Sequence, residues 1–550
     1  MTDETYPGPW QAVVDFLRHR GVTTIFGLPA DDLDLLRAVE DNPRLVLCRD
    51  QRSAMFLSIG YAMTSGGTAV CAIGKGPAVT NAVTGLLEAH SSGVPLVLLA
   101  AGTAVERRGS GAFQELDQIP LVAPLTKWAY RIDTPDRIGP ALERAFLVAG
   151  SGAPGPVYLE FPDHLLTQPV PKRSWSAGTV TAEEAGEAIL AAKRPLVLVG
   201  GGLRGAGHVA ESLATKIGAG LFVTASGRGS VAEEHPAFLG LAGLYSPAEA
   251  APLWEDADLL IALGTRLEET ATFRPGFVAE GVPVLQVNVD PHGMSTEYPG
   301  PRVLADAGDT VRTWLATVDA TPNRPWALEI AECRAASRSA VQDRLKVMAE
   351  SDAIHVAEVL AAVDRVAPSD RILVQENGLQ DMWSYFYPHW VCAPGGSVVP
   401  SEQTTLGFGT AAAGGVRLAA GDRPVIAFVG DGAFGMVGNE IRTLVEEKIG
   451  VLYVVLRNGG YGWLQHQYGD EPRFVDPHRA LAVPPGVRHT VLTDKSQLDE
   501  VLATGVTDSA AGHVVVVEVP VSLTDAPPGI TALDGDFPGG HPSGGTDDNA

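Results

Sequence analysis

Short runs of β-branched and aliphatic residues alternate with longer, alanine-rich stretches of helical period along most of this chain. One example is the run 69–73, which is followed by the helical stretch 78–90 and then by the run 95–100. Strands that alternate with helices pair in parallel, because each helix carries the chain back to the start of the next strand. The rhythm recurs three times. We therefore predict an α/β fold of three doubly wound parallel-sheet domains.

Two connecting segments separate the three repeats of this alternation of strands and helices. Proline-rich or polar residues fill 169–181 and 321–324, and a helical stretch at 326–350 leads into the last repeat. Residues 526–550 carry many Gly, Pro and Asp residues and almost no apolar pattern, which predicts a disordered tail or a loose cover over a site. The predicted domains span 1–172, 181–345 and 352–525.

The composition argues against several classes of function. Lys and Arg number 40 and Asp and Glu number 65, giving a net charge of −25, and no basic block interrupts the sequence. A nucleic-acid partner is therefore not expected. The first ten residues are acidic and polar, unlike a secretory leader, and no apolar run approaches the roughly 18 residues of a membrane span. The four cysteines are too far apart for a compact disulfide or zinc framework. We expect a cytoplasmic enzyme that acts on small molecules.

The most informative segment contains two strands that each end in a polar turn. The first strand, VIAFV, leads to Gly430-Asp431-Gly432 and a helical stretch from Asn439 to Glu447, and the second strand, VLYVVL, leads to Asn458-Gly459-Gly460. Neighbouring parallel strands end at the same edge of a sheet, where ligands of such sheets bind. We therefore expect Asp431 and Asn458 to lie side by side. Carboxylate, amide and carbonyl oxygens suit magnesium, and glycines let backbone N–H groups approach a diphosphate.

This segment resembles the signature of thiamine-diphosphate enzymes, which is Gly-Asp-Gly, a spacer of this length and then Asn. The resemblance implies that Asp431, Asn458 and the carbonyl of Gly460 hold Mg²⁺. The family usually has two asparagines here, whereas this chain has Arg457 before Asn458. An ordinary turn would explain Gly-Asp-Gly taken alone, but further segments match in the expected order. The resemblance also implies that residues of this segment contact the cofactor: Gly430, Asp431, Gly432, Ala433, Asn458 and Gly460.

Upstream segments extend the resemblance to the thiazolium and diphosphate contacts. Thr404 to Gly409 is similar to the stretch that lines the thiazolium, and Leu406 holds the place of the bulky residue that bends the cofactor into a V. Its other interpretation is a core leucine. Asn377 and Gly378 resemble the strand end that cradles the diphosphate, with Leu379-Gln380 in place of the usual Gln-His.

The first part of the chain resembles the pyrimidine-binding half of acetolactate-synthase-like members. In all, the resemblance covers about Val14 to Val521. The matching segments of the first domain are Phe26-Gly27-Leu28-Pro29, Gly60-Tyr61-Ala62, Gly76-Pro77 with Asn81, Phe113-Gln114-Glu115, Thr126-Lys127-Trp128 and Gly155 to Glu160. Because the pyrimidine and diphosphate halves join across two chains in this family, we expect a homodimer or a tetramer of such dimers.

The middle domain contains a dinucleotide fingerprint, Gly200, Gly202 and Gly205, between a strand and a helix. No acidic residue ends the following strand (GLFVTASG) to hold a ribose hydroxyl, so the pattern favours a close strand-to-helix turn over an NAD site. Acetolactate synthases bind FAD beside this domain and related enzymes do not. The sequence leaves FAD binding open.

One residue departs from the pattern at the centre of the chemistry. Family members carry a glutamate that bonds N1′ of the pyrimidine and shares a proton there, and the count back from Gly60 puts Gln51 in that place. We favour Gln51 over its neighbour Asp50, because a one-residue shift at a strand end turns a side chain to the other face. Gln51 can hydrogen-bond N1′ but cannot supply an acidic proton.

Three interpretations of this departure stay open. The enzyme can activate the cofactor slowly or with help from the substrate, as glyoxylate carboligases manage with an apolar residue here. It can also bind an already activated form, or perform a step that tolerates slow activation. A silent paralogue that binds the cofactor without turnover is the third. We favour the first, since the rest of the pattern is intact.

The resemblance predicts a carboligase that joins an acyl carbanion derived from a 2-keto acid to an acceptor carbonyl. Gln114 resembles the glutamine that condensing members place near the acceptor. The segment Gly462 to Gln467 lacks the Gln-Trp-Gln of acetolactate synthases, so plain pyruvate is not the expected acceptor. His466 is a candidate proton donor to the acceptor, and the alternative is a histidine of the pocket wall. A non-oxidative 2-keto-acid decarboxylase or a lyase is the rival function.

Overall fold

A computed structural model gives the fold. It describes residues 4–28, 35, 38–39, 42–48, 50–65, 67–91, 93–173, 175, 178–274, 276–400, 404, 406–438, 441–469, 472–476, 480–528 and 530. Pro29, Thr405, Asn439 and nearly all of the predicted tail 526–550 lie outside this set. The chain divides into two compact units, Met1–Thr181 with Val289–Leu304 and Ala182–Asn288 with Ala305–Ala550.

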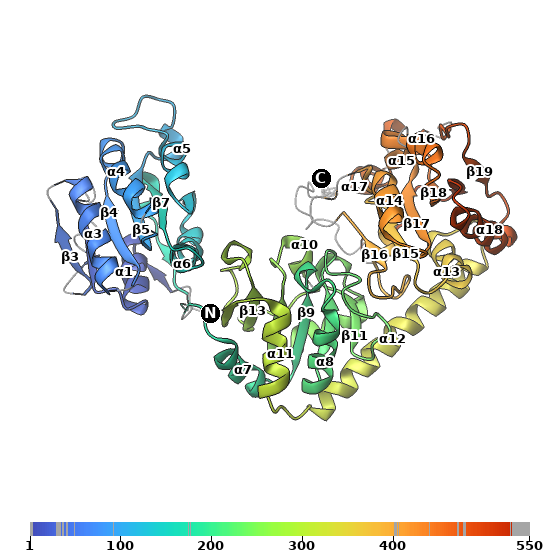
Figure 1. Cartoon of the computed structure of the whole chain (residues 1–550), viewed down its shortest axis with the longest axis horizontal. Coiled ribbons are helices and arrows are strands. Elements are labelled where there is room, and N and C mark those ends of the chain that lie inside the picture. Colours follow the sequence, from blue (N-terminus) through green and yellow to red (C-terminus); the bar gives the residue numbers. More distant parts are fainter. Residues whose placement is uncertain are drawn as a thin grey trace, which may run out of the picture. The chain divides into compact units, whose positions relative to one another are not determined.

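The first unit contains a six-stranded sheet with the strand order β3-β2-β4-β5-β7-β6, drawn in blue in Figure 1. All its strand pairs are parallel, and a small antiparallel pair, β1 (Thr5–Tyr6) with β8 (Val170–Pro171), stands apart. The strands are β2 (Thr24–Leu28), β3 (Arg44–Leu47), β4 (Ala69–Ile73), β5 (Leu96–Gly102), β6 (Trp128–Arg131) and β7 (Pro156–Pro162). The helices are α1 (Pro9–His19), α3 (Gln51–Ser65), α4 (Pro77–Ser91), α5 (Gln118–Val122) and α6 (Ile138–Gly150).

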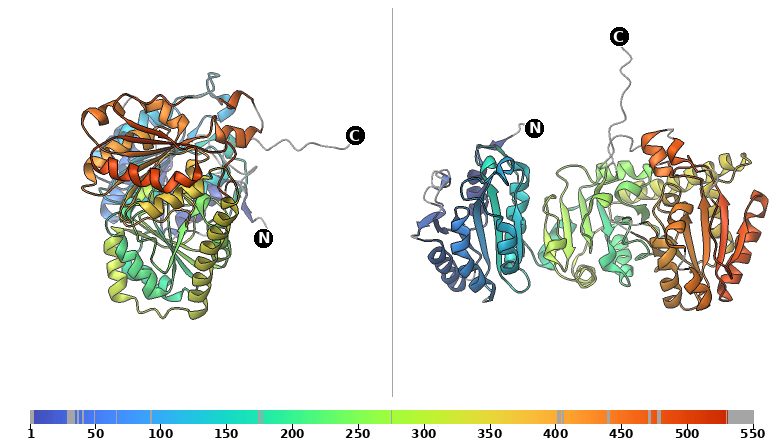
Figure 2. Two further views of the ribbon diagram at one scale, coloured as in Figure 1. Left: turned by 90° about the vertical axis from the view of Figure 1, so that its right-hand side faces the viewer. Right: turned by 90° about the horizontal axis from the view of Figure 1, so that it is seen from above.

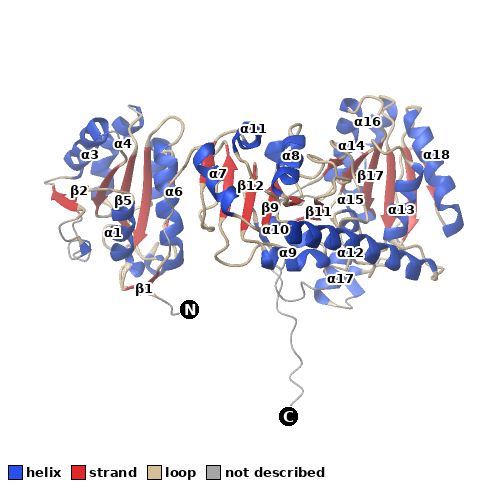
Figure 3. Ribbon diagram, turned by 90° about the horizontal axis from the view of Figure 1, so that it is seen from below, coloured by secondary structure: helices blue, strands red, loops and turns tan. Residues whose placement is uncertain are grey.

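Helices cover both faces of this sheet (Figures 2 and 3). Successive residues of β4 explain why. Val70 and Ala72 belong to the apolar core under α1 and α6, whereas Cys71 and Ile73 belong to the core under α3 and α4. A strand that buries both faces reads as a continuous apolar run, which is the pattern seen in the sequence.

The second unit holds the last sheet and five strands of the middle sheet, whose sixth strand, β14, falls in the range Val289–Leu304 of the first unit. The middle sheet has the order β11-β10-β9-β12-β13-β14. Its strands are β9 (Pro195–Val199), β10 (Gly220–Val223), β11 (Phe238–Leu241), β12 (Leu259–Leu263), β13 (Val284–Asn288) and β14 (Arg302–Leu304). The helices of this part are α7 (Ala182–Ala191), α8 (Gly207–Ile217), α9 (Ala251–Asp256), α10 (Glu269–Thr272), α11 (Ala307–Thr317) and α12 (Arg324–Ala349).

The last sheet has the order β16-β15-β17-β18-β20-β19, and all its strand pairs are parallel. Its strands are β15 (Ile372–Gln375), β16 (Ser397–Val398), β17 (Val425–Gly430), β18 (Leu452–Arg457), β19 (Arg488–Val491) and β20 (Val515–Pro520). The helices are α13 (Val356–Val366), α14 (Phe408–Ala419), α15 (Asp431–Val437), α16 (Ile441–Glu446), α17 (Gly462–Tyr468) and α18 (Leu498–Ala510). Two cores again lie on opposite faces, one under α13 and α18 and one under α14 and α16. The prediction of three doubly wound parallel sheets is confirmed.

The buried side chain of Arg228 links the middle and last parts of the second unit. The Arg228 guanidinium donates to the Glu233 carboxylate at 2.8 Å, and both side chains are fully buried. Arg228 also donates to the backbone carbonyls of Ser384 and Trp390 near the last sheet. Buried charges are stable only when they are paired in this way. Among the described residues, no helix is long and apolar enough to cross a bilayer.

Candidate functional site

The two polar turns of the cofactor motif meet at one sheet edge. Strands β17 and β18 are parallel neighbours, Asp431 follows β17 directly, and Asn458 follows β18 directly. The N–H of Gly459 donates to the Asp431 carboxylate at 3.4 Å, and Asp431 is buried. Asp431 and the turn that contains Asn458 therefore lie side by side, as the strand order predicts.

The helical stretch after Asp431 differs from the prediction. The sequence pattern predicts a turn and then a helix from Asn439 to Glu447. In the structure α15 begins at Asp431 itself, and α16 ends at Glu446. The early start has a packing cause, because it buries Phe434 against Tyr453 on the underlying sheet, with ring centroids 5.9 Å apart.

Asn458 is held by hydrogen bonds on both sides of its amide. Its oxygen accepts from the N–H of Gly460 at 2.9 Å, and its NH₂ group donates to the side-chain oxygen of Gln380 at 2.7 Å. Arg457, where the family usually shows asparagine, instead forms an ion pair with Glu518 on the neighbouring strand β20. The substitution at position 457 therefore leaves Asn458 in its place at the sheet edge.

The end of β15 contributes a second group of polar side chains. The buried Glu376 carboxylate accepts from the N–H groups of Asn377 and Gly409 at 3.1 and 2.9 Å, so it joins the strand end to the start of α14. The Asn377 amide donates to the carbonyl of Thr404 at 3.3 Å. Thr404 has a positive φ of 42°, an uncommon backbone conformation for a threonine. These contacts place Asn377, Gly378 and Thr404 on one side of the site.

A buried carboxyl group lies behind these turns. Burial raises the pKa of Asp381 well above its usual range, and the carboxylates of Glu376 and Asp431 raise it further. Burial also raises the pKa of Glu376, against the opposing effect of its backbone N–H donors. Negative charge is thus disfavoured here unless a cation compensates for it. A divalent cation at Asp431 would provide that compensation.

A cavity of about 770 Å³ opens over this edge of the sheet. Leu406 lines it and is 53% exposed, so the interpretation of Leu406 as a core leucine is wrong. The predicted residues that line the cavity are Asn377, Gly378, Thr404, Leu406, Gly430, Asp431, Gly432, Ala433, Asn458 and Gly460. Every residue predicted to contact the cofactor in this part of the chain therefore faces one space.

Two further groups of residues line the same cavity and were not predicted from the sequence. Tyr461 and Trp463 follow the Asn458 turn directly, and their aromatic character next to a polar turn was a signal that could have identified them. Leu244, Tyr245, Glu269, Thr270 and Phe273 come from the middle domain. Nothing in their local sequence indicates a site, because only the packing of the middle domain against the last sheet brings them there.

His466, the candidate proton donor, lies on α17 and is not among the residues that line the cavity. Its ring is 5.9 Å from the ring of Trp463, which does line it. His466 is therefore adjacent to a lining residue without lining the cavity itself.

The first unit holds the predicted pyrimidine-binding residues. Gln51 is the first residue of α3, and Asn81 lies on α4, which begins at Pro77. The Asn81 amide donates to the Gln51 oxygen at 3.1 Å, and Gln51 is buried. The two amides thus form a pair between adjacent helices.

Gln51 lies on a different element from the strand end that was expected. Strand β3 ends at Leu47, and Gln51 begins a helix, so the strand alternation used to prefer it to Asp50 does not apply. Asp50 instead precedes the helix, and its carbonyl accepts from the N–H of Ala54 at 3.1 Å. What distinguishes Gln51 in the structure is its burial and its contact with Asn81.

Gln114 lies close to the start of α4. Its φ of 57° is in the left-handed region, which is uncommon for a non-glycine residue and is frequent at functional sites. A Cβ at Gly76 would stand 2.5 Å from the Gln114 carbonyl oxygen, so only glycine permits this contact. Gln114 is therefore packed against the residue that precedes Pro77.

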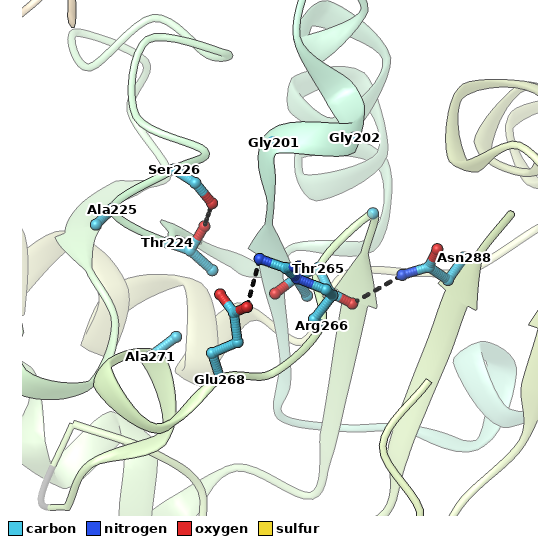
Figure 4. A pocket seen from close by; sticks show the side chains of 11 residues that line it. Gly201, Gly202, Thr224, Ala225, Ser226, Thr265, Arg266, Glu268, Ala271 and Asn288 are labelled. Atoms are coloured by element: carbon cyan, nitrogen blue, oxygen red, sulfur yellow. Dashed lines mark hydrogen bonds and ion pairs between the residues drawn. The ribbon is translucent and has the colours of Figure 1, made fainter. Parts of the chain in front are cut away.

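The dinucleotide fingerprint of the middle domain borders a smaller cavity, of about 260 Å³ (Figure 4). Gly202 lines it together with Ser226, Thr265 and Asn288, whereas Gly205 does not. A Cβ at Gly200 would stand 2.3 Å from the carbonyl oxygen of Gly264. The fingerprint therefore serves the close approach of two loops, as expected for a tight strand-to-helix turn.

The residues at the edge of the last sheet fit magnesium diphosphate. The Asp431 carboxylate, the Asn458 amide oxygen and the Gly460 carbonyl are hard oxygen donors, which Mg²⁺ prefers. The cavity beside them has room for an organic cofactor, and Leu406 lines it. The predicted pyrimidine-binding residues Gln51 and Asn81 supply amide groups, and position 51 carries no carboxylate.

Comparisons with known proteins match most of the chain. Residues 10–121, 182–313 and 376–519 match the N-terminal TPP-binding, central and C-terminal TPP-binding domains of thiamine pyrophosphate enzymes. The probable 2-ketoarginine decarboxylase AruI of Pseudomonas aeruginosa is 31% identical over 82% of this chain and 81% of that protein. The acetolactate synthase isozyme 1 large subunit of Escherichia coli is 28% identical over 83% of this chain and 82% of that protein.

One solved structure supports the fold. The thiamine diphosphate-dependent 4-hydroxybenzoylformate decarboxylase of Rhodococcus jostii RHA1 aligns with a TM-score of 0.51 and 23% identity. The alignment covers 94% of this chain and all of that chain.

Proposed function

Because the chain belongs to the thiamine pyrophosphate enzymes, we propose that it is a carboligase that uses thiamine diphosphate and Mg²⁺. The enzyme joins an acyl carbanion derived from a 2-keto acid to an acceptor carbonyl. When bound, thiamine diphosphate supplies the carbon nucleophile and holds the electron pair after carbon dioxide leaves. Asp431, Asn458 and the Gly460 carbonyl hold the cation that neutralises the diphosphate.

The observation that favours ligation is the placement of Gln114. This residue is held in a left-handed conformation against Gly76, next to the start of α4 that carries Asn81. It matches the glutamine that condensing members of the family place near the acceptor. Its amide can hold an acceptor carbonyl by donating a hydrogen bond to it. Gln51 and Asn81 hold the pyrimidine through amide hydrogen bonds.

The rival function is simple decarboxylation of a 2-keto acid, or the reverse lyase reaction. Two similar proteins are decarboxylases by name, so this candidate has support. Product analysis with and without an added aldehyde separates the two. The carboligase gives a 2-hydroxy ketone in proportion to the aldehyde, and a free aldehyde as the only product would contradict the proposal. If no 2-keto acid releases carbon dioxide, the chain is a silent paralogue.

The walls of the larger cavity favour one class of donor. Aromatic and aliphatic side chains such as Tyr245, Phe273 and Trp463 form much of the lining, and none of the lining residues that the structure describes is Lys, Arg or His. The acidic residues that line the cavity are Asp381, Asp431 and Glu269. The Glu269 carboxylate has no ion pair among the described residues. We propose a 2-keto acid with an aliphatic side chain that ends in a cation. The similarity to a 2-ketoarginine decarboxylase agrees with this class.

A panel of three 2-keto acids tests the donor. With carbon dioxide release as the readout, 2-keto-5-guanidinovalerate should exceed 2-ketoglutarate in kcat/KM by at least about tenfold, the factor for one hydrogen bond to a charged group, with 2-ketoisocaproate between them. Glu269→Gln should remove the advantage of the cationic substrate mainly through KM, because Glu269 is remote from the reacting bond. A preference for 2-ketoglutarate would contradict the assignment.

The first unit also has a feature expected of an assembly. Phe56 and Leu57 on α3 and Leu87 on α4 are each about half exposed, and large apolar side chains on neighbouring helices are common at subunit interfaces. We propose a homodimer or a tetramer of such dimers, since this family joins its two half-sites across two chains. Sedimentation equilibrium tests this, and an active monomer would contradict it.

A further inference from the structure

The side chain of Gln380 makes three hydrogen bonds beside the proposed metal ligand. Gln380 lies between β15 and the short helical turn Asp381–Ser384 and is 3% exposed. Its NH₂ group donates to the carbonyls of Ser522 and Leu523 at 3.2 and 2.9 Å, just after β20. Its oxygen accepts from the Asn458 amide at 2.7 Å. Gln380 therefore links Asn458 to the segment that follows the last strand.

The chemistry of these partners permits one orientation of each amide. Backbone carbonyls only accept, so the end of Gln380 that faces Ser522 and Leu523 must be its NH₂ group. The Gln380 oxygen must then face Asn458, and it needs a donor there. The NH₂ group of Asn458 supplies that donor. The Asn458 oxygen is consequently turned towards the Gly460 loop, where it accepts from the N–H of Gly460 at 2.9 Å and keeps a second lone pair.

A glycine makes this contact possible. A Cβ at Gly462 would stand 2.8 Å from the Gln380 oxygen and 3.2 Å from the Asn458 nitrogen. Any other residue at 462 would push the two amides apart. The chain therefore combines a buried glutamine, a glycine opposite it and two carbonyl acceptors around one asparagine.

We propose that Gln380 is the positioning residue that turns the Asn458 oxygen towards the cation, and that it couples this orientation to the chain at Ser522–Leu523. The inference rests on the proposed metal site. Without Gln380 only the N–H of Gly460 still holds the Asn458 oxygen in place, so a half-turn of the amide, which would present its NH₂ group to the cation, becomes easier. Residues that orient a metal ligand typically change metal affinity by about 10- to 100-fold when they are removed.

The test measures Mn²⁺ binding to the full-length protein in saturating thiamine diphosphate, by the electron paramagnetic resonance signal of free Mn²⁺. Gln380→Met keeps the length of the side chain and removes its hydrogen bonds, and it should weaken Mn²⁺ binding by about tenfold. The matched control is Gln375→Met. Gln375 is also a fully buried glutamine, at the end of β15 in the last sheet, but it bonds the hydroxyls of Ser384 and Ser397 and not a proposed metal ligand. The control should bind Mn²⁺ within about twofold of the parent, since it leaves the ligand set unchanged.

A double-mutant cycle separates orientation from general damage. In an Asn458→Asp background the ligand presents oxygen in either orientation, so Gln380→Met should then cost less than about twofold. Equal losses in the parent and in the Asn458→Asp background would overturn the inference, because they would indicate a purely structural role. If Gln380→Met does not fold, Gly462→Ala provides the second variant and should weaken binding in the parent background alone.

The proposed metal site can fail separately from this inference. If Asp431→Ala abolishes Mn²⁺ binding while both Gln380→Met and Gly462→Ala leave it unchanged, the orienting role is wrong and the metal site stands. If Asp431→Ala leaves Mn²⁺ binding unchanged, the metal site itself is wrong and the role of Gln380 falls with it.

Discussion

The last sheet presents Asp431, Asn458 and the Gly460 turn within a network of hydrogen bonds. The first unit presents a neutral amide, Gln51, at the place that the resemblance assigns to a glutamate. The first group departs from the family pattern beside its proposed ligands, at Arg457, Leu379 and Gln380. The second departs at the residue that shares a proton with the cofactor. We infer that cofactor binding and cofactor activation have separate determinants in this chain: the proposed cation ligands are kept, and the residue proposed to face N1′ is changed.

The largest expected effect concerns the proposed metal ligand Asp431. Asp431→Ala should weaken the binding of magnesium thiamine diphosphate by more than about 100-fold, since it removes a direct ligand and direct ligands exceed the supporting residues in effect. Isothermal titration calorimetry measures the affinity, and circular dichroism checks that the fold is retained. Asp422→Ala, an exposed carboxylate in the same domain, is the control and should change nothing. Tight binding by Asp431→Ala would contradict the family-based interpretation of this edge.

Acid should destabilise the second unit through His389. Burial, and then the nearby Arg344 guanidinium, lower the pKa of His389 from 6.5 to about 4. The folded state therefore disfavours the charged form, so the contribution is complete above pH 6.5 and is lost as the pH falls towards 4. The full loss is about 3 kcal/mol. Urea unfolding followed by tryptophan fluorescence should show it, and His389→Gln should flatten the profile between pH 7 and pH 4. An unchanged profile in that variant would show that other groups dominate.

A smaller effect is expected in the pyrimidine half. Asn81→Leu removes one hydrogen bond to Gln51. A neutral hydrogen bond contributes about 1 kcal/mol, so the Kd of thiamine diphosphate should rise by roughly fivefold. Calorimetry measures it, with the adjacent exposed Thr80→Val as the control. A loss as large as that of Asp431→Ala would remove the contrast between the two halves.

The grouping of Asp431 and Asn458 could be predicted from the sequence, because both residues directly follow strands that the sequence pattern indicates. The rule that parallel strands end at one edge was enough to bring Asp431 and Asn458 together across the intervening helices. The role of Gln380 could not be predicted in the same way. Its partners at Asn458 and Ser522 are far apart in sequence and converge only through the order of β15, β17, β18 and β20.

The pyrimidine half shows where pattern reasoning was weaker. The count to Gly60 predicts Gln51, which begins a helix and does not lie at a strand end, so strand alternation gives no reason to prefer it to Asp50. Helix and strand boundaries depend on packing that a single sequence does not specify. The middle-domain wall of the cavity, which includes Tyr245 and Glu269, was missed because its contacts form between domains.

The central claim is that Gln51, and not Asp50, faces N1′ of the aminopyrimidine. The most direct measurement is the rate of C2–H exchange of bound thiamine diphosphate, followed by quenched-flow proton NMR in the resting enzyme. The parent enzyme should exchange slowly, and Gln51→Glu should accelerate exchange by about 100-fold, the contribution typical of a positioned acid or base. Asp50→Asn should leave the rate unchanged. If Gln51→Glu has no effect while Asp50→Asn abolishes exchange, the carboxylate that activates the cofactor is Asp50 and the claim is wrong.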